Sequence, residues 1–492
     1  MAIKVIYKDI PIGAKENAKF TTTPVENFAN TEHLRNGAAT GAVATCELNC
    51  WGLSHDYKAR GTQKFALWSK TISDAEGIFT EIPSIVIDFT NQYTSTGLSF
   101  RFSPETNDYC TIIGVKWYQN GAVKETGIFY PDGPVWALEN AVEAFDKIEI
   151  LFGQTNLPHR RLKIEHIAVG IIREFDGREL TGASIMHEVD LISNSLPLNV
   201  LDASFHSSND AEYIFQRKQP VEAYNDDALI GVYYIETGER TSSQNYKITC
   251  HDAIGVLELD TYKGNLWLTD TPIETILDDI LKGAFTVEID AALQGATLRG
   301  YIQPDITKRE ALQKVAFALG ACVDTSGTAN IKLFLPEASG GTEISEKETY
   351  RGGTVTTADT VTEVVVVYYD IVNKRPGEND DYIEFNDVQY FYESNNATAK
   401  NPNLSTGTLP NKIVFSDCYL CNSTNAAKVA NSILAYYMRR NTYSAKHVAH
   451  DEGVGNRAIV HMPWGDTQTA NIKKMTISVT GITVSDTEFL LD

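Results

Sequence analysis

The chain has 492 residues, of which 43% are hydrophobic, and a formal net charge of −22. This excess of carboxylates argues against a surface that binds nucleic acid or an anionic membrane, because binding to either one requires lysine and arginine side chains that face phosphates. Its apolar runs stay well below the roughly 20 residues that a membrane-spanning helix needs. The N-terminal MAIKVIYKDIPIGAK lacks the apolar stretch of a secretory signal, so we expect synthesis in the cytosol and roughly three or four domains.

The first third of the chain has the pattern of a β protein. A strand is predicted from Ala2 to Tyr7, and turn signals such as Asn120-Gly121 and Asp132-Gly133 separate short alternating or apolar runs further on. The strongest of these runs cover residues 65–68, 85–89, 98–102, 111–118, 147–152 and 161–169. Many short strands at this spacing predict a β-sandwich of jelly-roll type over residues 41–170.

The next part of the chain combines strands with two short helices. The runs 229–235 and 246–252 predict a hairpin of long strands. Two T-x-x-E sequences, which start at Thr271 and Thr307, each predict a capped helix N-terminus followed by an apolar stripe. Glycines are predicted to end both helices, and a strand hairpin is predicted over residues 321–335.

The last part of the chain returns to strands. Residues 360–369 are apolar on both faces after Glu363, which predicts a central strand covered on both sides. Residues 425–440 have the apolar spacing of one helix, and strand patterns at 457–461 and 472–477 close the chain.

Signatures of enzymes and of metal sites are weak. The sequence holds no G-x-S-x-G, H-E-x-x-H or Walker A motif, so we predict no enzyme and no cofactor or metal site. Cys418 and Cys421 have C-x-x-C spacing without a second ligand pair, which favours buried thiols over zinc. His447 and His450 lie three positions apart, and on a strand this spacing directs the two rings to opposite faces.

Aromatic side chains in residues 41–170 are the candidate binding residues. Sugars stack on exposed aromatic rings of sandwich folds, whereas tryptophans spread over several strands more often belong to the core. The sequence leaves both alternatives open. The candidate glycan-binding residues are Trp51, Tyr57, Trp117, Tyr118 and Trp136.

Four segments carry a family resemblance through their pattern and order. They are VDLISNSLPLNVLDASFHSSND (189–210), LIGVYYIETGERTSSQNYKITCHDAIGVLE (229–258), GYIQPDITKREALQKVAFALGACVDTSG (300–327) and VGNRAIVHMPWGDTQTANIKKMTISVTG (454–481). In this order they resemble the tail hub (baseplate hub) proteins of bacteriophages and phage-tail-like particles. The resemblance covers about two-thirds of the chain. Residues 41–170 depart from it and resemble an inserted carbohydrate-binding module.

The resemblance implies a mainly β (α+β) fold in four parts. Residues 1–40 with 171–265 would form a first tube-type β-barrel, and 346–492, with the helix 425–440, a second one. Residues 41–170 would be the inserted jelly-roll-like sandwich, and 266–345 a small helix-and-strand domain.

The resemblance also implies a role in assembly. A homotrimer with two barrels per chain would form a pseudo-sixfold ring that adapts a sixfold tail tube to a threefold spike or tip. The implied partners are the tail tube, spike or tip, tape measure and other baseplate proteins of a virion tail or tail-like particle. DNA would pass through an acidic lumen without specific binding, because like charges repel.

The leading hypothesis is therefore a structural hub that is not an enzyme and does not bind membranes. The alternative is a tail-tip adhesin that contacts host cell-wall glycans through the inserted sandwich. The sequence leaves open whether the tail is contractile and whether the particle is a phage or a bacteriocin.

Overall fold

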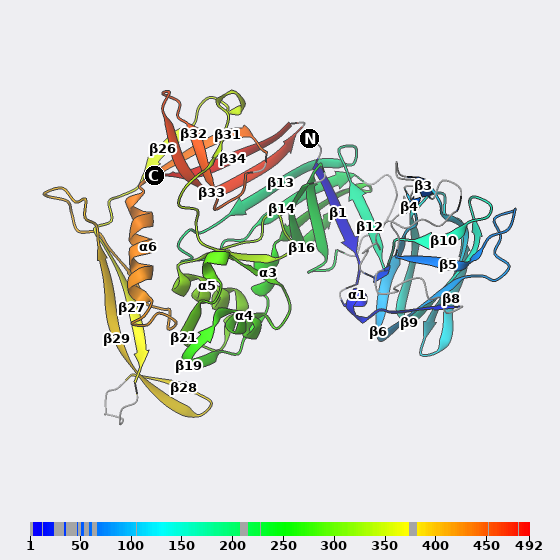
Figure 1. The fold of residues 1–492 in the computed structure, drawn as a ribbon, viewed down its shortest axis with the longest axis horizontal. Helices are drawn as coiled ribbons and strands as arrows, with labels where there is room; N and C mark the ends of the chain where they lie inside the picture. Colours follow the sequence, from blue (N-terminus) through cyan, green and yellow to red (C-terminus); the bar gives the residue numbers. More distant parts are fainter. Residues whose placement is uncertain are drawn as a thin grey trace. The chain divides into compact units, whose positions relative to one another are not determined.

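The computed structural model describes residues 3–11, 13–23, 34–35, 47, 51–53, 59–61, 66–104, 106–206, 215–226, 228–372, 381–450, 452–480 and 482–492. Strands dominate these residues and a few helices accompany them (Figure 1), which confirms the predicted mainly β class. The chain divides into two compact units. Unit 1 covers residues 1–5, 175–208 and 221–492, and unit 2 covers residues 6–174 and 209–220.

Unit 2 is built around a sheet of long strands in the order β11-β6-β9-β7-β8, with β2 also paired to β6. The strands of this sheet are β2 (Lys19–Thr23), β6 (Ser84–Arg101), β7 (Cys110–Gln119), β8 (Ala122–Phe129), β9 (Val135–Thr155) and β11 (His166–Ala168). Two smaller pairs accompany it, β5 (Leu67–Ile72) with β10 (Arg161–Ile164) and β3 (Trp51–Leu53) with β4 (Ala59–Gly61). The remaining elements are α1 (Ala14–Asn17), residues 6–9 of β1 (Ile3–Asp9) and residues 171–174 of β12 (Ile171–Phe175), and β1 pairs with β12.

Apolar and polar residues alternate along the strands of unit 2, and the apolar ones form its core. Ile87 on β6 pairs with Ile148 on β9, which pairs with Trp117 on β7, and all three side chains are buried. Directly paired residues share a face of the sheet, so these apolar positions make one continuous layer. The predicted strands 85–89 and 98–102 are the two ends of the single strand β6, whose register against β9 shifts between them.

Unit 1 contains a long sheet in the order β15-β16-β17-β14-β13-β33-β34-β31-β26. Its strands are β13 (Leu180–Glu188), β14 (Val200–His206), β15 (Pro220–Asn225), β16 (Ala228–Arg240), β17 (Asn245–His251), β26 (Thr354–Thr357), β31 (Asn441–Val448), β33 (Thr467–Thr480) and β34 (Ile482–Leu491). β32 (Arg457–His461) pairs with β33 and with β25 (Thr342–Glu343). The predicted hairpin of long strands is β16–β17, and β13 and β33 join antiparallel strands from distant parts of the chain.

A small helix-and-strand region lies between these strands in the sequence. Its helices are α3 (Ala253–Leu257), α4 (Ile273–Leu281) and α5 (Lys308–Leu319), with short 3-10 turns at Ala291–Leu293 and Glu346–Glu348. Its strand pairs are β18 (Thr261–Tyr262) with β22 (Ile306–Thr307), and β19 (Asn265–Pro272) with β21 (Thr297–Ile302). The predicted hairpin is β23 (Cys322–Asp324) with β24 (Ile331–Phe334), and β20 (Val287–Ile289) runs parallel to β24.

The two predicted helix caps have different outcomes. The Thr307 cap is confirmed, because the Glu310 N–H donates to Thr307 Oγ1 at 3.1 Å and the Thr307 N–H donates to Glu310 Oε2 at 2.9 Å. The Thr271 cap is wrong, because α4 begins one residue later, after Pro272, and Thr271 Oγ1 donates to the Thr269 carbonyl instead. Thr271 pairs with Leu298 in the β19–β21 ladder, so tertiary strand pairing overrides the local capping sequence.

The last sheet of unit 1 has the order β28-β29-β27-β30 and packs against one helix. Its strands are β27 (Glu363–Ile371), β28 (Tyr382–Phe385), β29 (Val388–Lys400) and β30 (Lys412–Phe415). The helix α6 (Ala426–Met438) runs along β27 and β29 (Figure 1). The central position of β27 and the existence of this helix are both confirmed.

No helix among the described residues has the length and apolar character needed to cross a membrane.

Candidate functional site

The structure places the five candidate glycan-binding residues in different surroundings. Trp117 is 1% exposed and packs edge-to-face against Phe129, inside the core of unit 2. Trp51 lies on β3, and Tyr57 lies outside the described residues. Tyr118 and Trp136 are both partly exposed.

Tyr118 and Trp136 do not converge on one site. Tyr118 on β7 pairs with Lys147 in the middle part of β9, whereas Trp136 is the second residue of β9 and pairs with Phe100. The Tyr118 hydroxyl donates to Glu149 Oε2 at 2.8 Å, and this hydrogen bond is the main cause of the raised pKa of Tyr118. Trp136 packs on the buried Phe100 ring at 5.8 Å between ring centroids. A ligand of one or two sugars could therefore meet one of these rings but not both.

Two carboxylates buried in unit 2, those of Glu47 and Asp108, lie against basic groups. Lys163 Nζ lies 2.9 Å from Glu47 Oε1 and 3.0 Å from Asp108 Oδ2, and its side chain is fully buried. Arg160 Nε is 3.4 Å from Asp108 Oδ1. Breaking a buried ion pair by removing one partner is strongly destabilising, so these contacts hold β10 against its neighbours.

The two short motifs that the sequence singled out are built into the packing of unit 1. His447 is buried, and its Nε2 is 2.9 Å from Thr487 Oγ1, whereas His450 is exposed and its Nε2 is 3.2 Å from Glu348 Oε2. The two rings therefore do not share a ligand. Cys418 and Cys421 are both buried free thiols. Over the described part of the chain, no group of three or more His, Cys, Asp or Glu side chains is placed to hold a metal ion.

The long sheet of unit 1 has one apolar and one polar face. Direct cross-strand neighbours Cys250, Leu201, Ile185 and Ile477 are all buried on the apolar face. On the other face, which we call the polar sheet face, the corresponding row is Thr249, Asp202, Ser184 and Ser478. The row runs without interruption from β17 to β33, so strands from residues 171–265 and from residues 346–492 present one shared surface.

Charges on the polar sheet face are matched across strands. Lys474 Nζ on β33 lies 2.9 Å from Glu188 Oε2 on β13, and Lys446 Nζ on β31 lies 3.8 Å from Asp486 Oδ2 on β34. Thr249 Oγ1 donates to Asp202 Oδ1 at 2.6 Å. This face thus offers a broad surface of paired charges and hydroxyls.

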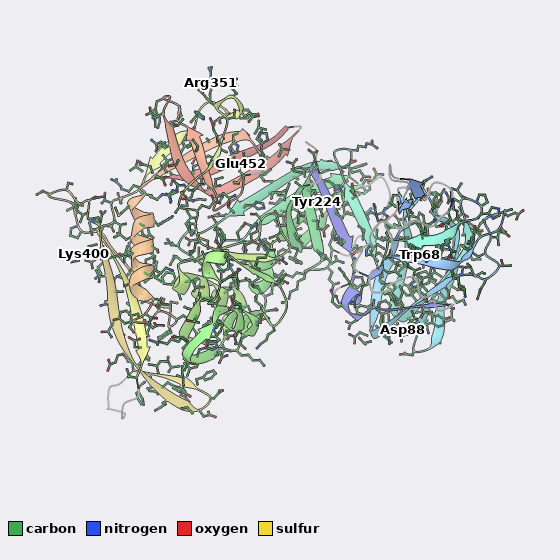
Figure 2. The ribbon with its side chains drawn as sticks, viewed as in Figure 1. Trp68, Asp88, Tyr224, Arg351, Lys400 and Glu452 are labelled. Carbon is green, nitrogen blue, oxygen red and sulfur yellow. The ribbon has the colours of Figure 1, made fainter. Side chains whose placement is uncertain are left out.

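A shallow cavity of about 290 Å³ opens on the polar sheet face beside the loop before β26. Arg351 projects from this loop (Figure 2). The cavity is lined by Tyr350, Arg351, Lys446, Lys474, Asp486 and Glu488. Because its basic and acidic groups are mixed, it lacks the single sign of charge that a specific anion or cation site requires.

A buried polar network fixes the β23–β24 hairpin to the long sheet. Asn199 Nδ2 donates to Thr325 Oγ1 at 2.9 Å, and Thr325 Oγ1 donates to Asp252 Oδ2 at 2.6 Å. Asp252 also caps α3 by accepting from the Gly255 N–H at 3.2 Å. Burial raises the pKa of Asp252 to about 6, since desolvation disfavours the carboxylate. This network gave no motif in the sequence, because its members come from three separate segments.

A second buried titratable group lies in the same sheet. His187 on β13 is 4% exposed, and its Nε2 lies 2.6 Å from the Tyr233 hydroxyl on β16. Burial lowers the pKa of His187 to about 4, since desolvation disfavours the imidazolium. Its hydrogen bond to Tyr233 is a packing contact inside the sheet, and neither group reaches a surface from which it could act on a substrate.

No protein-family model matches the chain, and no curated protein matches its sequence. Among solved structures it is similar to a tail protein from Neisseria meningitidis, with 12% identity and a TM-score of 0.48 over 65% of this chain and 94% of that one. It is also similar to the prophage MuSo2 43 kDa tail protein from Shewanella oneidensis, with 9% identity and a TM-score of 0.46 over 64% of this chain and 94% of that one. For the prophage tail protein gp18 from Listeria monocytogenes the identity is 9% and the TM-score 0.43, over 64% of this chain and 91% of that one.

Proposed function

We propose that this protein is a structural hub at the end of a phage tail or phage-tail-like particle. It would form a homotrimeric ring that adapts a sixfold tail tube to a threefold spike or tip. Its role would be assembly and not catalysis, with tail tube, spike, tape measure and other baseplate proteins as partners.

The observation that carries the proposal is the pairing of β13 with β33. It places strands of both predicted barrel segments in one sheet, with Ile185 opposite Ile477 on the apolar face and Ser184 opposite Ser478 on the polar face. A chain that contributes two adjacent parts of a ring wall needs such a rigid connection between them. The segments that carry the family resemblance supply β14, β16, β17, α5 and β33 of this unit.

The polar sheet face supports the expected passage of DNA without specific binding. Lys474 and Lys446 on this face are held by Glu188 and Asp486. Lysines held in ion pairs have less attraction for phosphate than free ones, because a carboxylate already neutralises them. Together with the net charge of −22, this favours a surface that DNA does not adhere to.

The experiment that tests the hub proposal is gold labelling of tail particles with an antibody to this protein, followed by electron microscopy. Label at one end of the tail tube is the expected result. Intact tails without label at either end, even after mild disruption to expose covered epitopes, would overturn the proposal.

The alternative, a tail-tip adhesin that binds cell-wall glycans, rests on Trp136. This ring is partly exposed and packs beside its cross-strand neighbour Phe100, which would help to hold it in place for stacking against a sugar. A glycan array probed with the intact chain tests it. Binding that Trp136→Ala abolishes and Tyr118→Phe preserves would favour the adhesin, and the absence of binding would exclude it.

A further inference from the structure

The loop between β30 and α6 brings the thiols of Cys418 and Cys421 together. The Cys421 N–H donates to the Cys418 carbonyl at 3.0 Å, which closes a turn. A turn of this kind keeps its first and fourth Cα atoms within about 7 Å, and disulfides span Cα separations of about 4.4–6.8 Å. The Cys418 thiol donates to the Lys314 carbonyl at 3.4 Å. The backbone of the pair therefore lies within the range that a disulfide spans.

The two thiols differ in access and in acidity. Cys418 is 7% exposed and lines a cavity of about 320 Å³ together with Lys314, Phe317 and Asp417, whereas Cys421 is fully buried behind it. The neighbouring Cys421 side chain lowers the pKa of Cys418, and the charge of Lys314 adds to this effect. The Cys418 side chain, together with burial, raises the pKa of Cys421. Cys418 is thus the thiol that a small reagent meets and the one that more readily forms the thiolate.

The loop that carries this pair connects three parts of unit 1. The Tyr419 ring stacks on Tyr369 of β27 at 4.2 Å, and the Tyr419 carbonyl accepts from the Tyr301 N–H of β21 at 3.3 Å. Lys314 of α5 donates from Nζ to the Asp417 carbonyl at 2.6 Å. The approach to β21 is tight, because a methyl group on Gly300 would lie 2.1 Å from the Tyr419 oxygen. A disulfide in this loop would therefore hold the helix-and-strand region against the β27–β30 sheet.

We propose that Cys418 and Cys421 are a redox-active pair that small-molecule disulfides oxidise to an intramolecular disulfide. In the first step the Cys418 thiolate attacks one sulfur of the reagent RS–SR. A Cys418–SR bond forms, the RS–SR bond breaks, and the leaving RS⁻ takes up the proton that Cys418 gave up. In the second step the Cys421 thiolate attacks the Cys418 sulfur and displaces the second RS⁻, which is protonated in turn. Two protein thiols are oxidised and one reagent disulfide is reduced to two thiols.

The proposal assigns different roles to the two cysteines, and oxidised glutathione tests both on the native full-length chain. Mass spectrometry of unreduced peptides is expected to show a Cys418–Cys421 disulfide. The Cys421→Ser variant is expected to retain one glutathione on Cys418, since the resolving thiol is gone, and Cys418→Ser is expected to form neither product. Cys250→Ser and Cys322→Ser are matched controls, because these thiols are buried in strands and burial raises the pKa of both.

Closing the disulfide should also raise the thermal stability of the native chain. The pair closes a short loop, so we expect an increase in Tm of about 2–5 °C over the reduced chain. The proposal is overturned if the folded wild type, confirmed by circular dichroism, forms no 418–421 disulfide. It is equally overturned if Cys421→Ser traps no glutathione at Cys418, or if Cys250 and Cys322 react as fast as Cys418. These readouts use the purified chain, so their failure leaves the proposed hub function untouched.

Discussion

At the scale of single residues, the two T-x-x-E sequences show how one local pattern takes two roles. Thr307 caps α5 through a reciprocal pair of hydrogen bonds, whereas Thr271 belongs to the β19–β21 ladder and caps nothing. We expect Thr307→Ala to lower the free energy of unfolding by about 1 kcal/mol, and Thr271→Ala to change it by less than about 0.5 kcal/mol. Urea unfolding of both variants measures this difference. Equal losses would show that the Thr307 box adds nothing beyond side-chain packing.

Asp252 should make stability depend on pH in a direction opposite to that of most carboxylates. Its folded-state pKa of about 6 lies above its unfolded value. Its contribution to the free energy of unfolding is therefore fully present below about pH 4 and is lost as the pH rises through 6. Asp252→Asn removes this loss and keeps a good helix cap. We expect the stability of the variant relative to wild type to increase by about 2–3 kcal/mol between pH 4 and pH 7. Urea unfolding at several pH values tests this, and a difference that stays constant with pH would refute it.

His187 should act with the opposite sign in the same pH window. Its folded-state pKa of about 4 lies below its unfolded value. Its contribution to the free energy of unfolding is therefore present above about pH 6.5 and is lost as the pH falls toward 4. His187→Gln keeps a partner for the Tyr233 hydroxyl and removes the titration. The stability of this variant relative to wild type should therefore rise as the pH is lowered from 7 to 4. A relative stability that falls over this range would contradict the assignment of a buried neutral imidazole.

At the scale of elements, the turn between β7 and β8 shows local sequence deciding local structure. Asn120 and Gly121 have φ angles of 51° and 82°, as the predicted N-G hairpin turn requires. Gly121→Ala should cost about 1 kcal/mol through backbone strain alone, since a Cβ there meets nothing within 4 Å. Gly133→Ala is the matched control, because Gly133 lacks a positive φ and has comparable space. Thermal unfolding should show a lower Tm for the first variant only, and an equal fall in both would rule out strain at Gly121 as the cause.

The pairing of β13 with β33 is the element-scale feature that local signals did not predict. Residues 183–188 pair with residues 474–479, which lie almost three hundred positions away in the chain. Alternation predicts that each strand has an apolar face, and Ile185 and Ile477 are both buried on it. Alternation alone does not choose the partner strand, because many strands of this chain present the same pattern.

At the scale of the whole molecule, the proposed ring predicts a defined oligomer. Light scattering coupled to size exclusion should give three times the chain mass of 54.4 kDa. A closed ring buries the same surface of every copy, so the trimer should persist on dilution without larger open assemblies. A monomer at micromolar concentration would contradict a ring that forms without its tail partners.

The sequence by itself determined the mainly β class, the capped helix α5, the N-G turn, the hairpin β16–β17 and the central strand β27. Each of these follows from hydrophobic periodicity or from turn and capping chemistry within a few neighbouring residues. Tertiary structure alone decided that Thr271 joins a strand, that Trp117 is core, that Tyr118 and Trp136 lie far apart on the sheet, and that Cys418 faces a cavity while Cys421 does not. The physical reason is that burial and strand partnership are set by contacts between segments far apart in the chain, and no local pattern specifies those contacts.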